Sequence, residues 1–214
     1  NKNTFVTCTG AKKMSTKKIY NKREYILEKS KDIFTKKGFT SVTMTDIIDA
    51  CNISRGGLYL YFSSVDEIFI EMILSINAQK LNEAKTSVTE DKTFTELIDI
   101  YFKKQKNRIL NIDSSLLMAM HQYRFSHKND SDEMFFSEQF LNTKMILLEL
   151  LNYGIHTNEI RIENTEDLAV HIMLFIEGLS TLAATSTPSE EFIDSQIEFI
   201  KKLIFTKNRN VGGL

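Results

Sequence analysis

Apolar residues recur along most of this chain at spacings of three and four, which is the period of an amphipathic α-helix. Over Lys22–Lys37, residues Ile26, Ser30 and Phe34 share one face of such a helix. Gly38 follows two lysines there, and a glycine after basic residues is a typical helix ending. This stretch therefore predicts a first helix whose inner face begins a core.

The next segment predicts two short helices joined by a tight turn. Thr43 opens a Thr-x-x-Asp capping pattern for a helix over about Thr45–Cys51. Asn52 occupies the turn and tolerates left-handed geometry, and Ser54 caps a third helix that extends to about Phe62. Such an arrangement is how small domains present a helix to the major groove of DNA.

The rest of the chain continues in the helical period. A fourth helix is predicted from a cap at Ser64 to about Lys85, followed by a loop over Thr86–Lys92. Further helices are predicted at Thr93–Asn111, Ser114–His127, Ser131–Tyr153, Thr165–Thr185 and about Glu190–Thr206. One proline and eight glycines in 214 residues favour long helices over a turn-rich sheet. The predicted fold class is all-α, an N-terminal three-helix helix-turn-helix domain followed by a C-terminal helical bundle for ligand binding and dimerisation.

Charge divides the chain in the same way. Residues 1–65 hold 12 Lys+Arg against five Asp+Glu, a net +7, and the remainder carries −8. A basic first third suits a polyanionic partner, although solvated surfaces and a basic tail would give the same count. We expect a DNA-binding domain over 14–65 and a larger domain over 66–207. Residues 1–13 are expected to be an appended or unstructured tail, and 208–214 a frayed tail.

Composition excludes several other classes. No apolar run approaches the ~18 residues of a membrane span, so no membrane association is expected. Cys8 and Cys51 are the only cysteines and suggest no disulfide framework, which favours a cytoplasmic protein. The four histidines lie at no metal-ligand spacing, and no phosphate loop or nucleophile motif occurs. No metal, cofactor or enzymatic activity is therefore expected. The histidines are His121, His127, His156 and His171.

The N-terminal motifs resemble a known family in order, spacing and length. The matching residues are Gly38-Phe39, Thr43, Thr45, Ile48, Ile53-Ser54-Arg55-Gly56, Leu58-Tyr59, Tyr61-Phe62, Ser64 and Glu67-Ile68-Phe69. Residues 22–70 thus resemble the DNA-binding domain of the tetracycline-repressor (TetR) family of bacterial regulators. The resemblance implies a homodimeric transcription regulator with a divergent ligand domain.

Three departures from the family pattern stand out. Asn52 replaces a frequent turn glycine, and Ile48 and Cys51 replace alanines at packing positions. Val65 stands where the family usually has a phosphate-binding lysine, so one phosphate contact is in doubt.

Helix three has the residue types that DNA recognition needs. Arg55 can bond guanine O6 and N7 together, and the small Gly56 and Gly57 let the backbone approach base edges. Hydroxyls and lysines suit phosphates. The predicted DNA-binding residues are Thr43, Thr45, Ser54, Arg55, Gly56, Gly57, Tyr59, Tyr61, Lys22 and Arg23, with Lys17 and Lys18 beside the minor groove.

Each of these residues also has a purely structural interpretation. Thr43 and Ser54 cap helices whether or not DNA is present, and Leu58 and Phe62 suit the core better than a contact surface. A lone Arg55 would be an ordinary surface residue, and only its surroundings favour base readout.

Methionines and aromatic residues in the middle of the chain suggest an adaptable ligand pocket, although ordinary bundle core explains each one singly. The predicted pocket residues are Met118, His121, Gln122, Tyr123, Phe125, Phe136, Met145 and Phe175.

The last two long helices are predicted to form the dimer interface as a four-helix contact, with burial inside one subunit as the alternative. The predicted interface residues are Leu168, Ile172, Phe175, Leu179, Ile193, Ile197 and Ile200.

The favoured function is a homodimeric repressor that binds an inverted-repeat operator in double-stranded DNA and is released by a small apolar effector. Two alternatives stay open: a DNA-binding dimer without an effector, and a helical enzyme that uses the central Met and Phe cluster.

Overall fold

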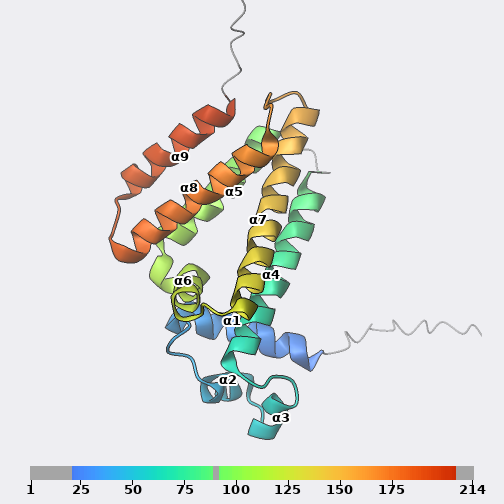
Figure 1. The fold of residues 1–214 in the computed structure, drawn as a ribbon, viewed down its shortest axis with the longest axis vertical. Coiled ribbons are helices and arrows are strands. Elements are labelled where there is room, and N and C mark those ends of the chain that lie inside the picture. The colour runs from blue at the N-terminus through green and yellow to red at the C-terminus, as the bar shows by residue number, and fades with distance from the viewer. Residues whose placement is uncertain (1–20, 89–91, 206–214) are drawn as a thin grey trace, which may run out of the picture.

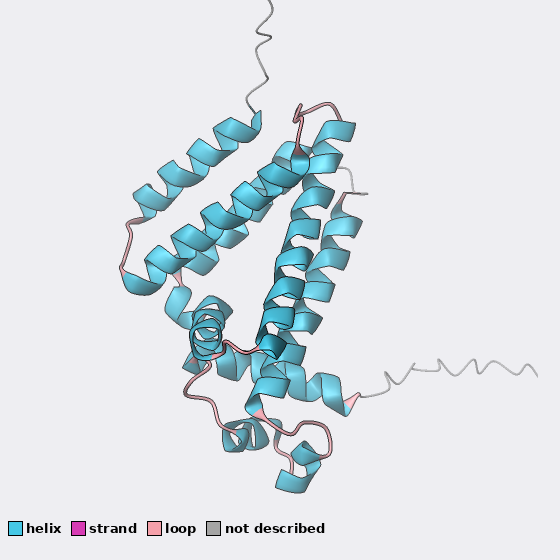
Figure 2. Ribbon diagram, in the orientation of Figure 1, coloured by secondary structure: helices cyan, strands magenta, loops and turns pink. Residues whose placement is uncertain are grey.

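The computed structural model describes residues 21–88 and 92–205, and this part of the chain is helical without a strand (Figures 1 and 2). The predicted tails 1–13 and 208–214, together with Lys17 and Lys18, lie outside the described residues. The small helices α2 and α3 lie at one end of the molecule and α9 lies toward the other (Figure 1).

The helices follow the predicted order. They are α1 (Lys22–Lys37), α2 (Met44–Cys51), α3 (Arg55–Tyr59), α4 (Val65–Ser87), α5 (Phe94–Leu110), the 3₁₀ turn η1 (Ile112–Ser114), α6 (Leu116–Ser126), α7 (Asp130–His156), α8 (Thr165–Thr185) and α9 (Glu190–Phe205). Both ends of α1 and of α8 match the sequence prediction. The all-α fold class is confirmed.

The third helix is shorter than predicted. It ends at Tyr59 rather than Phe62, because the chain must turn to bring Phe62 back into the core behind Leu58. Both side chains are fully buried, as expected for scaffold residues. Helix α4 extends to Ser87, beyond the predicted end at Lys85, so the following loop starts later than predicted.

A first hydrophobic core joins the N-terminal helices to the larger bundle. Phe34, Phe39 and Phe69 form a cluster with centroid distances of 4.9 to 6.1 Å. Tyr123 of α6 packs edge-on against Phe39 at 4.9 Å. Because Ile68 and Phe69 are also fully buried in this core, it continues along α4 past the predicted domain boundary at residue 65.

A second core lies inside the bundle formed by α5, α7, α8 and α9. Its members are Phe94, Ile98, Phe102, Ile109, Leu147, Leu151, Ile160, Ala169, Ile172, Leu179, Ile193, Ile197, Ile200 and Ile204. The close approach of α5 to α7 uses Gly154, where a Cβ would lie 2.6 Å from the Phe94 ring.

Helix α8 is more apolar than the sequence analysis recognised. It is long and apolar enough to cross a bilayer, with a mean hydropathy of 1.6 over an 18-residue window of which 22% is buried. Only the length and composition of α8 resemble those of a membrane span. In this structure the helix packs on α5, α6 and α7. Part of the apolar surface of α8 is therefore left uncovered by the other helices of the chain.

Gly38→Ala should destabilise the fold. Gly38 has φ 71°, where a Cβ is strained, and an added Cβ would lie 2.8 Å from Nε2 of Gln122. Together these effects should lower the free energy of unfolding by about 2 kcal/mol, measured by urea denaturation. Gly56→Ala is the control, because no atom lies within 4 Å of its added Cβ. In a Gln122→Ala background the loss should shrink to the backbone strain alone, and an unchanged loss would contradict the proposed clash.

Candidate DNA-binding surface and regulatory helices

Capping groups fix the geometry of the helix-turn-helix. Thr43 and Asp46 form a complete capping box on α2, and Asn52 ends that helix in the left-handed conformation at φ 50°, ψ 51°. The Ser54 hydroxyl accepts a hydrogen bond from Gly57 N at 3.0 Å at the start of α3. Each cap is worth about 1 kcal/mol, so the angle between α2 and α3 is set locally.

The outer face of α3 is open. Arg55 and Gly56 are exposed, and the Arg55 guanidinium lies 5.6 Å from the centre of the Tyr59 ring, which is 44% exposed. Leu60 follows at 82% exposure, a residue that the sequence analysis did not select. An exposed leucine beside a DNA-reading helix can contact a thymine methyl group. Leu60 is exposed next to α3 because that helix ends at Tyr59, earlier than predicted.

Lys22 and the hydroxyl-bearing residues stay available to a phosphate backbone. Lys22 lies beside α3, with its ammonium 3.6 Å from the position of a Cβ on Gly57 and 6.0 Å from the Tyr61 ring centre. Thr45 is exposed and Tyr61 is half-buried. These residues border one surface together with α3.

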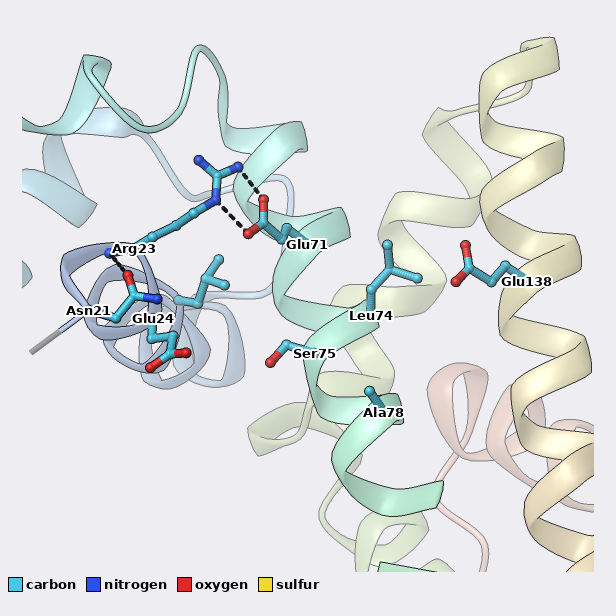
Figure 3. Close-up of a pocket in the computed structure, with 9 residues that line it drawn as sticks. Asn21, Arg23, Glu24, Glu71, Leu74, Ser75, Ala78 and Glu138 are labelled. Carbon is cyan, nitrogen blue, oxygen red and sulfur yellow. Dashed lines mark hydrogen bonds and ion pairs between the residues drawn. The ribbon is translucent and has the colours of Figure 1, made fainter. Parts of the chain in front are cut away.

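Arg23, predicted to contact DNA, is bound inside the protein instead. Its guanidinium bonds both carboxylate oxygens of Glu71 (Figure 3). It also donates to the Tyr61 carbonyl at 2.5 Å and stacks 4.3 Å from the Phe62 ring centre. The hydrogen bonds to Glu71, with the charges of Glu71 and of Glu67 at 3.6 Å, raise the Arg23 pKa. Arg23 therefore ties α1 to α4 instead of extending toward a phosphate.

The predicted pocket residues are not gathered around one cavity. The three polar candidates are each satisfied inside the protein: His121 bonds Ser180 at 2.7 Å and the Tyr123 hydroxyl donates to Asp132 at 3.0 Å. The Gln122 Oε1 accepts from the Phe39 backbone nitrogen at 2.6 Å.

The apolar pocket candidates also lie apart. Phe125 is 68% exposed and Met145 is 40% exposed, because both fall on outward faces of their helices. Met118, Phe136 and Phe175 are half-buried. Sequence periodicity could not distinguish these outward faces from inward ones, since both are apolar here.

A groove does occur elsewhere, between the start of α1, the middle of α4 and α7 (Figure 3). It encloses about 450 Å³ and is open to solvent. Arg23, Glu71, Leu74 and Glu138 are among its lining residues. None of the eight predicted pocket residues lines it.

The predicted dimer residues are mostly core. Ile172, Leu179, Ile193, Ile197 and Ile200 are at most 7% exposed within one subunit and pack against α5 and α7. These five side chains lie in the core of one subunit, the alternative named for them, because the most apolar face of each helix packs inside its own chain. Leu168 and Phe175 are half-buried beside the same core.

A second apolar face on the same helices remains uncovered. On α8 it consists of Leu174, Gly178 and Leu182, spaced four residues apart, and on α9 it includes Phe199 and Leu203. Leu174 and Phe199 are 61% and 60% exposed, and nothing lies within 4 Å of a Cβ placed on Gly178. We name these five residues the α8–α9 outer face.

No group of three or more His, Cys, Asp or Glu residues able to hold a metal ion occurs in residues 21–88 and 92–205. Cys51 is buried among apolar side chains, which raises its thiol pKa and makes it a packing residue.

Comparison with known proteins agrees with this geometry. The family model "bacterial regulatory proteins, tetR family" matches residues 26–72. The HTH-type transcriptional regulator YfiR of Bacillus subtilis is 33% identical over 112 residues, which cover 50% of this chain and 53% of YfiR. The chain thus spans about half the length of this curated relative.

Solved structures share the fold at low identity. Reduced NemR of E. coli has a TM-score of 0.69 at 17% identity and covers 88% of this chain and 100% of its own. FadR of Bacillus subtilis in complex with stearoyl-CoA has a TM-score of 0.63 at 19% identity, with coverages of 83% and 96%. The chain therefore shares the fold of these two proteins over most of its length.

The capping box should make stability depend on pH. Lys37 at 2.6 Å and the Thr43 backbone and hydroxyl lower the Asp46 pKa to about 2. A carboxyl whose folded pKa lies below its unfolded value near 3.8 stabilises the fold above pH 4, and the contribution is lost as the pH falls toward 2. Asp46→Asn should therefore lower the Tm at pH 6, and the gap to wild type should narrow to less than half at pH 2.5. A gap of equal size at both pH values would contradict this origin. Asp49→Asn, on the exposed face of α2, is the control.

Proposed function

Because the chain belongs to the tetR family of bacterial regulatory proteins, we propose that it is a homodimeric transcriptional repressor. In this proposal it binds an inverted-repeat operator sequence-specifically and is released by a small-molecule effector. Family members are regulators and not enzymes, which removes the helical-enzyme alternative. Since the DNA is in the bacterial cytoplasm, we place the protein there.

One observation carries the DNA-binding proposal. Arg55 and Gly56 are exposed on a helix whose first turn is open and whose N-terminus is fixed by the Ser54 cap. Lys22 lies beside that helix and could bind a flanking phosphate. This combination fits base readout in a major groove together with sequence-independent backbone contacts. Arg23 is left out of the proposed contact set because Glu71 neutralises it.

An effector is favoured over regulation by abundance alone, because α6 connects both domains through polar contacts. Gln122 binds the α1–α2 loop, and His127 pairs with Asp66 at the start of α4 at 2.9 Å. His121 and Arg124 bind α8. A ligand that displaces α6 would therefore change the position of the recognition helix. The fold is one that holds stearoyl-CoA in FadR.

We assign dimerisation to the α8–α9 outer face. Exposed leucine and phenylalanine side chains on two helices that share one core are typical of an interface between subunits. Gly178 would allow the α8 helices of two subunits to approach closely. A dimer places two α3 helices on successive major grooves, about 34 Å apart, which is why the operator should be an inverted repeat.

Arg55→Ala and Lys22→Ala should impair DNA binding in different ways. The operator is first selected from a random duplex pool. Arg55→Ala should lower its affinity about 10- to 100-fold and abolish preference at one base pair, since a bidentate base contact is lost. Lys22→Ala should weaken all sequences alike and reduce the salt slope by about 1. Fluorescence anisotropy at several salt concentrations measures both. Uniform loss at every base position for Arg55→Ala would contradict its role.

Leu174→Glu and Phe199→Glu should each convert the dimer to monomers, because a buried unpaired carboxylate opposes association. Sedimentation velocity at micromolar concentration measures the change. Leu141→Glu is the matched control, since Leu141 is 51% exposed on the outer side of α7. Retention of the dimer in both variants would show that another face forms it, and loss in all three would point to misfolding.

A further inference from the structure

Helix α3 is too short to hold its own direction. It has five residues, Arg55–Tyr59, and an isolated helix of this length is not stable in water. The buried Leu58 anchors its inner side and the Ser54 cap fixes its beginning. Its end needs a further partner, because Leu60, which follows it, is 82% exposed and anchors nothing. The direction of α3 therefore depends on what holds the next residues, 61–63.

Arg23 of α1 contacts two of these residues. Its Nη1 atom donates to the Tyr61 carbonyl at 2.5 Å, a bond between residues 38 positions apart in the chain. The same guanidinium lies 4.3 Å from the centre of the Phe62 ring, and the Phe62 side chain is 1% exposed. A cation over an aromatic face is attracted by the ring. One side chain thus holds the backbone of one residue and the ring of the next.

Helix α4 holds this guanidinium in the orientation that the two contacts need. The Arg23 Nε atom donates to one carboxylate oxygen of Glu71 at 2.6 Å, and Nη2 donates to the other (Figure 3). This two-point geometry fixes the plane of the guanidinium, which a lysine ammonium could not reproduce. Glu67, one turn earlier on α4, lies 3.6 Å from Nη2. Arg23 therefore reaches Tyr61 and Phe62 from a position that α4 sets.

Glu67 also holds the same segment directly. Its Oε2 atom accepts hydrogen bonds from the Ser63 backbone nitrogen and from the Ser63 hydroxyl, both at 2.7 Å. Tyr61 is therefore held through its carbonyl and Ser63 through its amide, with the buried Phe62 between them. We name three residues the α1–α4 clamp: Arg23, Glu67 and Glu71. The clamp fastens the end of the recognition segment to the first two turns of α4.

We propose that Arg23 is a positioning residue for operator binding, which orients α3 by holding Tyr61 and Phe62 and makes no contact with DNA itself. This role deepens the proposed function and rests on it. Glu71 already accepts from two nitrogens of the guanidinium, so little of its charge is left for a phosphate. The Arg23 and Glu71 side chains are 37% and 34% exposed, and ion pairs this exposed add little to stability. Loss of the pair should therefore change the direction of α3 more than the stability of the fold.

A substitution at Glu71 separates positioning from a phosphate contact. If Arg23 contacted DNA, Glu71→Gln would free the guanidinium and remove a negative charge, and every duplex would be bound more tightly. If Arg23 positions α3, Glu71→Gln removes the acceptor that orients the guanidinium, and the operator is bound more weakly. The two roles therefore predict effects of opposite sign for one substitution.

The test measures fluorescence anisotropy of the full chain with the selected operator and with a random duplex, at several salt concentrations. Arg23→Gln and Glu71→Gln should each weaken operator binding about tenfold, and the double variant should lose about as much as either alone, because both act on one contact. Affinity for the random duplex and the salt slope should stay as in wild type, whereas Lys22→Ala should lower both. Arg23→Lys keeps the charge without the planar guanidinium and should bind the operator about as weakly as Arg23→Gln.

Hydrogen exchange gives a readout that needs no DNA. In Arg23→Gln the amides of residues 58–64 should exchange about tenfold faster, whereas those of α8 should exchange as in wild type. Lys144→Gln is the matched control, since this lysine pairs with Glu166 and joins α7 to α8 instead of α1 to α4. It should change neither the operator affinity nor the exchange of residues 58–64. Titration of the active fraction and thermal unfolding distinguish a misplaced α3 from a smaller folded fraction.

The positioning role and the repressor proposal fail separately. Tighter operator binding by Glu71→Gln, or full affinity in Arg23→Lys, would overturn the positioning role in favour of a phosphate contact. If wild type binds a selected operator and Arg23→Gln binds it equally well, the positioning role is wrong and the repressor remains. If wild type selects no sequence, the repressor is wrong, and the exchange of residues 58–64 alone decides whether the clamp holds the segment.

Discussion

The contact between Gln122 and the α1–α2 loop joins the two halves of the molecule. The Oε1 atom of Gln122 accepts hydrogen bonds from the backbone nitrogens of Phe39 at 2.6 Å and Thr40 at 3.2 Å. The amide can approach only because Gly38 has no side chain. The Phe39 donor is partly buried, and a buried backbone donor left without an acceptor would cost about 1–3 kcal/mol. The register of α6 against the DNA-binding domain is therefore fixed by this amide and by the ring of Tyr123 behind it.

The same helix is also tied to α8, so it contacts both parts of the molecule. His121 and Arg124 bind Ser180 and Glu177 of α8. At its other end His127 pairs with Asp66. A helix of eleven residues moves as a rigid body, so these polar contacts shift together or break together. Two discrete arrangements of α6 would thus differ at the α1–α2 loop and at α8 at once.

The sequence predicted most of the fold, because periodicity, caps and breakers act within a few residues of each other. Capping at Thr43 and Ser54 and the packing of Leu58 and Phe62 are local consequences of this kind. The misassignments involved distant partners. From the sequence Arg23 had no evident partner, because Glu71 lies 48 residues away and only the fold brings it close. Both faces of α8 are apolar, so composition could not distinguish the face covered by α5 and α7 from the outer face.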